Sequence, residues 1–389
     1  MIEILKKINS SNSGKKVQVP HCVNAECIYY NESNIHDTNW RKVHGTYKTK
    51  AFGTVTRYKC THCGRTFSDQ SFSIDYYVKI PVDYFALFQY LISTSGQGNM
   101  TRFTGLRWRL IQNRYERLSR MFLALHGSLR KKVNVSEDLA LDGFETFSLS
   151  QFFPCHMNNL VGTDSEYLYG SGYAQLRRKG RMTPQQKLRR KVLEKTIGKA
   201  PGNAIEKDVT HLLTDMCNVL QEKEIAEKVI RTDEHKAYVR AMKNVDMSDV
   251  LLIHEQYSSR TYRNYTNKLF APNLTDRQLR KDQANHVRET VQFARCPSAM
   301  MTRTIVYMMY HNYIAPRRVK QQRRGNWETR IEMLGVSFSE LCSLLEKYWN
   351  RRPFRQKCEL WQGEDNTWFM RWRNKGIHMG RYVPKYIAT

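Results

Sequence analysis

The sequence lacks any long uninterrupted apolar run. No stretch reaches the roughly 18 apolar residues that a bilayer-spanning helix requires. The opening segment MIEILKKINSSNSGKK has an apolar part that is too short for a secretory signal. We therefore expect no membrane partner and a cytoplasmic location.

Acidic residues are scarce in comparison with basic ones. Lys and Arg number 63 against 36 Asp and Glu, which gives a formal net charge of +27 over 389 residues. The excess is spread along the whole chain, so a solvated basic surface explains it poorly and a polyanion, most simply nucleic acid, is the expected partner. A hydrophobic content of 41% argues against disorder, and the length allows two or three domains.

Cysteine is too sparse for a disulfide framework. The nine cysteines form two close pairs plus single residues, which fits a reducing compartment and a metal site. The pairs lie in HCVNAEC and CTHCGRTFSD, and the gap between them leaves room for the two or three strands of a zinc ribbon. Four thiolates leave no open position, so we expect a structural Zn²⁺. The predicted zinc ligands are Cys22, Cys27, Cys60 and Cys63. Four unrelated thiols are the alternative.

Residues 76–132 have the pattern of two helices joined by a glycine-containing turn. In the second helix Leu110, Leu118 and Leu125 recur at near-helical spacing and would face a core, while the arginines lie mostly elsewhere. This layout is typical of a helix-turn-helix that offers one helix to the major groove of DNA. A helical hairpin with a solvated basic face is the alternative. The arginines expected to contact DNA are Arg107, Arg109, Arg114 and Arg117.

Short apolar runs closed by Gly or Asp predict strands further along the chain. The runs at 139–147, 157–164 and 165–176 predict an antiparallel meander. An amphipathic helix is expected near 204–222, a buried strand should end at Thr232 or Asp233, and another strand is expected at 249–255.

Two aspartates close buried strands. Asp142 ends LAL and precedes Gly143, and Asp233 follows KVIRT. An isolated Asp at such a position is usually a turn or cap residue. Two of them in a basic protein are better explained as metal ligands held on neighbouring strands. Mg²⁺ binds carboxylates together with substrate phosphate and water, and two ions about 4 Å apart can serve the attacking and leaving oxygens.

These parts follow one another in a specific order over residues 20–316. After the cysteine pairs and the helix-turn-helix come LALDGFETF, LRRKGRMT, VIRTDEHKAY, HEQYSSR, DRQLRKDQANHVRETVQFAR and YMMYHNYIAP. The order resembles bacterial insertion-sequence transposases with an RNase H-like, acidic-triad (DDE) catalytic domain. The resemblance implies an α/β fold in which helices flank a mixed sheet, with Asp142 on its first strand, Asp233 after its fourth and a third acid on the following helix.

The same resemblance implies an activity and partners. Such enzymes cut and join double-stranded DNA at the ends of a mobile element, near the bacterial nucleoid. They use Mg²⁺ or Mn²⁺ to activate a water that frees a 3′-hydroxyl, which then attacks another phosphodiester. They generally act as homo-oligomers on DNA, on both terminal repeats and target.

The third acid has three candidates in NLTDRQLRKDQANHVRETVQFAR, residues 273–295, which reads as one helix. Thr275 and Gln278 fit a capping box that places Asp276 in the first turn, so that acid has a structural explanation. Glu289 has no explanation of this kind. The predicted catalytic and Mg²⁺-binding set is therefore Asp142, Asp233 and Glu289, with Asp276 and Asp282 as alternatives to Glu289.

Further basic residues are expected to contact DNA phosphates. One face of the helix at 273–295 is basic, and the connection LRRKGRMTPQQKLRRK is strongly basic as well. A solvated loop is the alternative for the connection. The residues predicted to contact nucleic acid are Arg177, Arg178, Lys179, Arg181, Lys281 and Arg288.

We divide the chain into five segments. They are a flexible arm (1–19), a zinc ribbon (20–75), a helix-turn-helix domain (76–132), an RNase H-like catalytic domain (133–316) with a basic insertion near 177–222, and a basic Trp-rich extension (317–389). The last segment lies outside the resemblance.

Two other functions fit the same patterns. One is a regulator that binds DNA through the zinc ribbon and helix-turn-helix without any catalysis. The other is a metal-dependent nuclease that cuts without joining. The presence of both Asp142 and Asp233 favours a catalytic protein, and strand-transfer products would exclude the simple nuclease.

Overall fold

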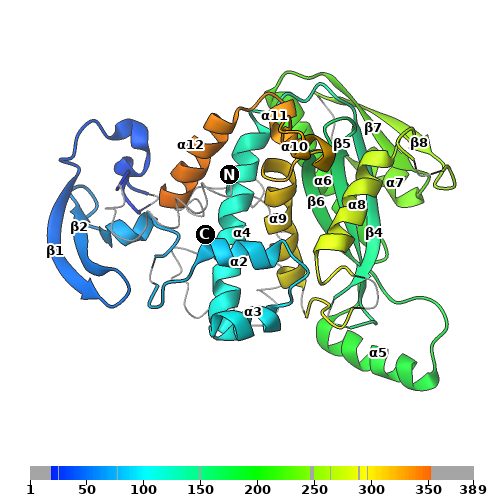
Figure 1. Cartoon of the computed structure of the whole chain (residues 1–389), viewed down its shortest axis with the longest axis horizontal. Helices are drawn as coiled ribbons and strands as arrows, with labels where there is room; N and C mark the ends of the chain where they lie inside the picture. Colours follow the sequence, from blue (N-terminus) through cyan, green and yellow to red (C-terminus); the bar gives the residue numbers. More distant parts are fainter. Residues whose placement is uncertain are drawn as a thin grey trace.

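The chain builds a small antiparallel sheet at one end, a larger mixed sheet at the other, and a layer of helices between them (Figure 1). This computed structural model describes residues 19–351 apart from 25, 77, 149, 246–248, 263, 288, 289 and 296. The predicted arm at 1–19, apart from Val19, lies outside the described residues, as does the part of the predicted Trp-rich extension (317–389) after residue 351. None of the described helices combines the length and apolar character that a bilayer crossing requires.

The small sheet has three antiparallel strands in the order β1-β2-β3. Its strands are β1 (Arg41–Thr49), β2 (Gly53–Cys60) and β3 (Thr66–Ser68), and the 3₁₀ turns η1 (Ile28–Tyr30), η2 (Glu32–Asn34) and η3 (Asp69–Phe72) flank them. Trp40 stacks on Phe67 with ring centroids 5.7 Å apart, and Phe72 contacts Phe67 edge-on. The cysteines complete this small core, which is separate from the main one.

Three helices, rather than the expected two, follow the small sheet. They are α2 (Tyr84–Leu91), α3 (Gln97–Thr104) and α4 (Trp108–Arg130). The Asp83 side chain caps α2 by accepting hydrogen bonds from the backbone amides of Phe85 and Ala86. Gly105 has a φ of 67°, a left-handed conformation that glycine adopts without strain, and this ends α3 before α4 begins.

The larger sheet has five strands in the order β6-β5-β4-β7-β8. The antiparallel meander is confirmed in β4 (Leu139–Phe147), β5 (Pro154–Gly162) and β6 (Leu168–Gln175). Next to β4 lie two parallel strands, β7 (Glu227–Asp233) and β8 (Leu251–Tyr257). The sheet is therefore mixed, as expected.

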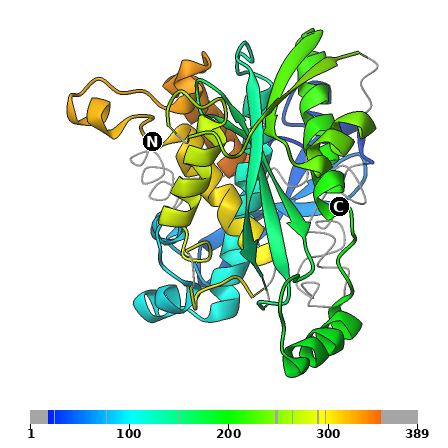
Figure 2. The same ribbon diagram turned by 90° about the vertical axis from the view of Figure 1, so that its right-hand side faces the viewer.

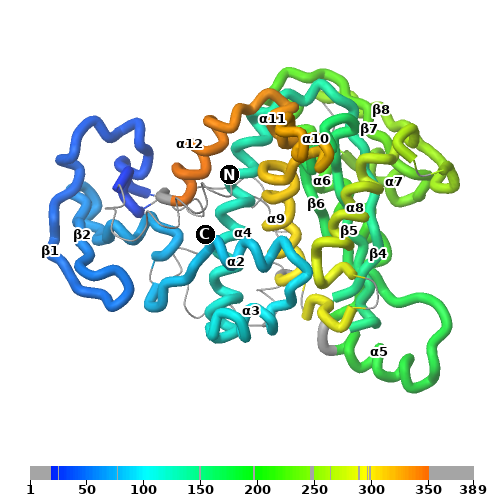
Figure 3. The backbone as a smooth tube through the Cα atoms, viewed as in Figure 1, coloured from blue at the N-terminus to red at the C-terminus, as the bar shows by residue number. Residues whose placement is uncertain are grey.

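Helices cover both faces of this sheet (Figure 2). One face carries α6 (Ala204–Glu222) and α7 (Lys236–Asn244), and the other carries α8 (Phe270–Asp282) and α9 (Pro297–Tyr313). The predicted amphipathic helix at 204–222 is confirmed as α6. Because α6 packs on β5 and β6, it is part of the sheet's cover. Of the predicted insertion at 177–222, only the part before Ala204, which includes α5 (Pro184–Ile197), extends away from the sheet (Figure 3).

One apolar core joins the central helices to the larger sheet. Its buried side chains run from Ile74 to Trp349 without a break at residues 132 or 316. Trp349 belongs to α12 (Phe338–Arg351), which follows the short helices α10 (Val319–Arg323) and α11 (Arg330–Met333), and it packs edge-on against Tyr84 at 5.5 Å. The boundaries predicted at these two positions therefore do not separate independent cores.

Hydrogen bonds also connect the central helices to the helices that cover the larger sheet. Gln283, directly after α8, donates a hydrogen bond of 2.9 Å to the carbonyl of Leu91. Arg303 of α9 donates to the carbonyls of Ser93 (3.2 Å) and Ser95 (3.0 Å). Both side chains are buried. The loop between α2 and α3 is thus tied to the helices that cover the larger sheet.

Candidate metal and catalytic sites

The four cysteines predicted to bind zinc meet at the base of the small sheet. Their sulfur atoms all lie within 4.8 Å of one another. Cys22 and Cys27 lie in the segment before η1, Cys60 ends β2, and Cys63 lies in the turn that follows. Within the described residues, no other group of three or more Cys, His, Asp or Glu side chains brings its ligand atoms this close together.

The sulfur spacing fits a tetrahedral zinc ion. A Zn–S bond of about 2.3 Å places the corners of a tetrahedron about 3.8 Å apart. The Cys22 and Cys63 sulfurs are 3.5 Å apart, and the Cys27 and Cys60 sulfurs are 3.7 Å apart. The backbone amide of Asn24 points at the Cys22 sulfur at 3.4 Å, as expected for an amide that supports a thiolate. His62 Nδ1 lies 3.6 Å from the Cys27 sulfur, outside the four-thiol set.

The fold shifts the pKa values of these thiols in different directions. Burial raises the pKa of Cys22 and of Cys27 above the ordinary value for a thiol. At Cys63, burial opposes ionisation, but the Arg65 backbone amide and the neighbouring thiols lower the pKa to about 7. A bound cation would favour all four thiolates. The cluster could therefore hold a metal such as zinc.

Asp142 and Asp233 lie side by side on neighbouring parallel strands. Leu139 of β4 pairs with Ile230 of β7. Asp142 follows Leu139 by three residues, and Asp233 follows Ile230 by three residues. Paired positions on adjacent strands point their side chains to the same face. The register thus places both carboxylates at the carboxyl end of β7, on one face of the sheet.

Local contacts fix the orientation of these two acids. The Asp142 carboxylate accepts a hydrogen bond of 2.7 Å from the Gly143 amide, and the Asp233 carboxylate accepts one of 2.9 Å from the His235 amide. Position 143 also requires glycine, since a Cβ there would lie 2.2 Å from the carbonyl oxygen of Met157. The glycine lets β5 approach β4 closely beside Asp142.

Asp276 lies with these two acids, and its predicted position in the first turn of the helix is wrong. Helix α8 begins at Phe270, not at residue 276, so Asp276 lies in the second turn. The Thr275 hydroxyl donates to the carbonyl of Ala271, within the helix, at 3.0 Å and forms no capping box. Thr275, Asp276 and Leu279 form the buried face of α8, which packs on β4 and β5. Pro272 was the overlooked signal, because proline is tolerated in the first turn of a helix.

The single helix expected over 273–295 ends at Asp282. Gln283 has extended backbone angles, φ −107° and ψ 116°, and turns inward to the carbonyl of Leu91. Glu289, the predicted third acid, lies outside the described residues, as does Arg288. Asp282 is held by the Tyr307 hydroxyl at 2.9 Å and does not line the cavity that Asp142 shares with Asp276.

A row of polar side chains crosses the sheet beneath α8. Asp142 pairs with Asn159 on β5, and Asn159 pairs with Ser171 on β6. The Ser171 hydroxyl donates to Asn159 Oδ1 at 2.7 Å, and Asn159 Nδ2 donates to Asp276 Oδ1 at 2.7 Å. The serine fixes the amide so that its NH₂ group points at Asp276. Neither Asn159 nor Ser171 was predicted from the sequence, although asparagine in a buried strand is unusual enough to serve as a signal.

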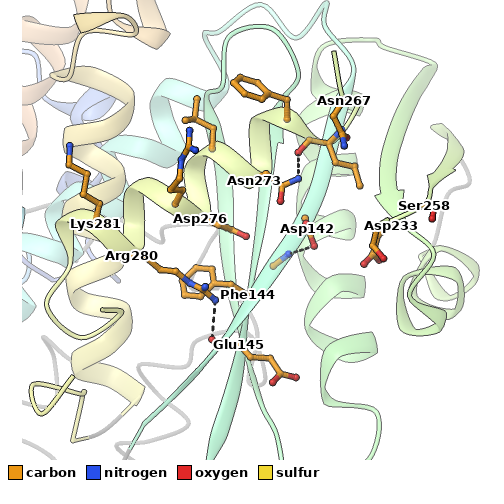
Figure 4. Close-up of a pocket in the computed structure, with 16 residues that line it drawn as sticks. Asp142, Phe144, Glu145, Asp233, Ser258, Asn267, Asn273, Asp276, Arg280 and Lys281 are labelled. Atoms are coloured by element: carbon orange, nitrogen blue, oxygen red, sulfur yellow. Dashed lines mark hydrogen bonds between the residues drawn. The ribbon is translucent and has the colours of Figure 1, made fainter. Parts of the chain in front are cut away.

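The three aspartates line one open cavity of about 710 Å³. Figure 4 shows Asp142 between Asp276 and Asp233, with the carboxylates turned towards the same space. Burial raises the pKa of nearby Tyr238 well above its ordinary value, and the charges of Asp142, Asp233, Asp276 and Asp208 add to the rise. All four carboxylates therefore lie close enough to Tyr238 to act on its hydroxyl.

Cations stand at the rim of the same cavity. Arg277, Arg280 and Lys281 of α8 line it, and Arg277 and Lys281 are exposed. The Arg280 guanidinium lies 5.0 Å from the centre of the Phe144 ring and donates to the carbonyl of Glu145 at 3.3 Å. Carboxylates at the centre with cations at the rim suit a phosphodiester held beside metal ions.

Arg114 and Arg117 are buried in α4, which corrects the prediction that they contact DNA. They are 5% and 7% exposed. Arg117 donates to the carbonyls of Ile74 (2.9 Å) and Tyr76 (2.8 Å) and stacks on the Tyr76 ring. Arg114 donates to the carbonyl of Ile80 at 3.2 Å. These guanidinium groups hold the segment before α2 and present no surface to a phosphate.

The other predicted DNA contacts differ in their exposure. Arg107 and Arg109 flank the exposed start of α4. In the basic connection, Lys179 and Arg181 are exposed, whereas Arg177 pairs with Glu194 at 2.7 Å and Arg178 donates to Gln151 at 2.5 Å. Lys281 stands at the rim of the aspartate cavity. Apart from Arg114 and Arg117, all the predicted contacts within the described residues therefore reach the surface or the cavity.

Comparison of the chain with models of protein families, with curated proteins and with solved structures gives no match.

Proposed function

We propose that the protein is a metal-dependent DNA transposase that cuts DNA at the ends of a mobile element and joins them to a target. The observation that carries the proposal is the convergence of Asp142, Asp233 and Asp276 on one cavity with a basic rim. These acids come from the first and fourth strands of the mixed sheet and from a following helix. An RNase H-like acidic-triad domain is expected to place its acids in this way.

The three aspartates would hold Mg²⁺ or Mn²⁺, in place of the set with Glu289 that the sequence favoured. Their chemistry fits, because Mg²⁺ prefers carboxylate oxygens and keeps positions for water and phosphate. When bound, such ions activate the attacking oxygen and stabilise the leaving oxygen of a phosphodiester. The chain itself orients the carboxylates: Gly143, His235 and Asn159 each donate a hydrogen bond to one of them.

The remaining parts would bind the substrate. Arg277, Arg280 and Lys281 are placed to hold phosphates at the cavity rim. Arg107 and Arg109, at the start of α4, suit contact with the major groove, since a recognition helix reads bases with its first residues. Lys179 and Arg181 extend the basic surface. The cysteine cluster would act as a zinc ribbon with a structural ion.

The test is an assay for strand cleavage and strand transfer with purified protein. The substrate is duplex DNA that carries the sequences flanking the gene, with a supercoiled plasmid as target and Mg²⁺ as the metal. Wild-type protein should produce nicked ends and joined products. Asp142→Asn and Asp233→Asn should lose both products while they bind the duplex with unchanged affinity, because the carboxylates hold metal rather than DNA.

The same assay separates the alternatives. Cleavage without joined products would favour a simple nuclease. Binding without any cleavage by the wild-type protein would favour a non-catalytic regulator. Full activity in either aspartate variant would refute the catalytic assignment.

Replacing Asn159 by alanine should weaken metal use without removing the acids. Loss of the amide removes the hydrogen bond that Asn159 donates to the Asp276 carboxylate. Partners of metal ligands typically contribute about 10–100-fold in affinity or activity. We expect a rise of this order in the Mg²⁺ concentration that gives half-maximal cleavage. Ser171→Ala should also raise the required Mg²⁺ concentration, but by less. It removes only the hydrogen bond that orients the Asn159 amide and keeps the amide itself.

Asn158→Ala is the matched control for this prediction. Asn158 is the preceding residue on β5, is equally buried and donates to Asp208 of α6, on the opposite face. It should lower thermal stability and leave the Mg²⁺ requirement unchanged. An equal Mg²⁺ shift in both variants would mean that Asn159 has only a structural role.

A further inference from the structure

The hairpin of β1 and β2 is unusually exposed. Each of the seven residues from Lys42 to Lys48 on β1 is solvent-exposed, so the strand shows both of its faces to solvent. A strand that only completed a fold would bury one face. The hairpin lies at one end of the molecule, away from the larger sheet (Figure 1).

The charge of this segment has one sign. No acidic residue occurs between Thr38 and Ser68. The Arg41 guanidinium makes contacts within the protein, since it lies over the rings of Trp40 and Tyr58 and donates to the carbonyl of Val19 at 2.8 Å. The cations that remain on the hairpin are Lys42, Lys48, Lys50, Arg57 and Lys59.

Three of these cations share one face of the hairpin. Lys42 lies directly opposite Lys59 in the strand register. Arg57 is two residues before Lys59 and therefore points to the same side. Like charges directly opposite one another destabilise a strand pair. Such a pair is favourable when an anion lies against it.

A bulge shapes the hairpin at Arg57. The register passes from Val43 opposite Tyr58 to Thr46 opposite Thr56, so that His44 and Gly45 together face Arg57. Gly45 has a φ of 88°, which glycine adopts without strain. A bulge adds twist and redirects the side chains beside it. Arg57 is exposed at this point.

We propose that the β1–β2 hairpin inserts into the major groove of the DNA that the protein binds. The groove is about 12 Å wide and admits a two-stranded β-ribbon. Lys42 and Lys59 contact phosphates, and Arg57 contacts a guanine through its O6 and N7 atoms. The proposal rests on the proposed function for the presence of DNA. It adds a recognition element beyond the helix-turn-helix, where burial of Arg114 and Arg117 leaves only the start of α4 exposed.

The test measures binding of the full chain, with its zinc, to DNA. The probe is a short duplex selected from a pool with a randomised centre for binding to the wild-type protein. Lys42→Ala/Lys59→Ala should bind more weakly, and its plot of log affinity against log salt should become shallower by about 0.9 for each phosphate that the variant no longer neutralises. Lys207→Ala, which removes an exposed charge on α6, is the control and should change neither quantity.

Arg57→Lys separates phosphate contact from base reading. Lysine keeps the charge but lacks the planar fork that pairs with guanine. We expect the salt dependence to stay the same and preference for the selected duplex over a scrambled one to fall about tenfold. Dimethyl sulfate should show one guanine N7, a major-groove atom, that wild-type protein protects and Arg57→Ala does not. Unchanged zinc content and thermal melting would show that each variant is folded.

The outcomes distinguish this inference from the proposed function. If all hairpin variants bind with wild-type affinity, salt dependence and N7 protection while wild-type protein cleaves DNA, the hairpin proposal is refuted and the transposase proposal stands. If wild-type protein selects no duplex from the pool, both fail. Loss of N7 protection in Arg57→Ala alone, with protection intact in Lys207→Ala, supports the hairpin proposal.

Discussion

Asp276→Asn should abolish Mg²⁺-dependent DNA cleavage. Asn159 holds the Asp276 carboxylate in the cavity that Asp142 and Asp233 also line. The amide that replaces it keeps the shape but lacks the negative charge that a divalent ion requires. A metal-bound transition state gains several kcal/mol from its ligands, so we expect a loss of roughly a thousandfold or more in the cleavage rate. Single-turnover cleavage of an end-labelled duplex measures it.

Two substitutions in the same region serve as controls for this result. Asp282→Asn changes an acid on the same helix that bonds to Tyr307 instead of lining the cavity, and it should keep near wild-type activity. Glu289→Gln tests the acid that the sequence favoured. If Glu289→Gln is inactive while Asp276→Asn cleaves normally, the third ligand is Glu289 and the assignment of Asp276 is wrong.

Removal of zinc should unfold the cysteine module and leave the rest of the chain folded. The small core contains Cys22, Cys27 and Cys60 themselves, with few other buried side chains. Structural zinc sites contribute roughly 10–16 kcal/mol of apparent binding free energy, which a core of this size cannot replace. After chelation, limited proteolysis should cut within residues 20–75 and spare the region from α2 onwards. Cys60→Ser should behave in the same way without a chelator.

The control for the zinc experiment is Cys342→Ser. Cys342 is a half-buried thiol on α12 and lies outside the cluster. This variant should retain one zinc ion per chain by elemental analysis and resist proteolysis like the wild type. Protein purified without zinc, yet resistant to proteolysis across residues 20–75, would contradict the assignment of a structural metal.

The strands and the placement of Asp142 and Asp233 on neighbouring strands could be predicted from sequence because their signals are local. Asp233 closes the short apolar run of β7, and Asp142 follows the apolar run that begins β4, although that strand continues to Phe147 and does not end at Asp142 as expected. Cysteine spacing likewise predicted which four thiols would meet. In these cases residues that are close in sequence determine both the strand or turn that forms and the side chains that it presents.

The position of Asp276 beside Asp142 and Asp233 could not be predicted in this way, because distant parts of the chain determine where α8 begins and ends. The helical pattern of the sequence continues through Val287 and Val291, yet Val291 is 84% exposed. Gln283 instead leaves the helix to reach a carbonyl that lies 192 residues earlier in the sequence. Tertiary contacts therefore outweighed the helical periodicity. The preference for Glu289 over Asp276 depended on a helix that starts near Asp276, whereas α8 starts at Phe270.

The arginines of α4 show the same limit. A basic residue on an amphipathic helix normally signals a solvated face, but Arg117 satisfies backbone carbonyls of the segment before α2. Buried carbonyls outside regular structure need donors, and no sequence pattern reveals which carbonyls those are. The prediction of DNA contact by Arg114 and Arg117 failed for this reason.

The continuous core between the central helices and the larger sheet has a geometric consequence. With α2, α4 and the sheet packed into one body, the start of α4 and the three aspartates stay at a fixed separation. If the protein binds DNA through the start of α4 and cuts it at the aspartates, this rigid body sets the distance between the bound sequence and the cleaved phosphate. Each additional base pair moves the scissile phosphate about 3.4 Å along the duplex. Spacing, as well as base sequence, would then decide which DNA is a substrate.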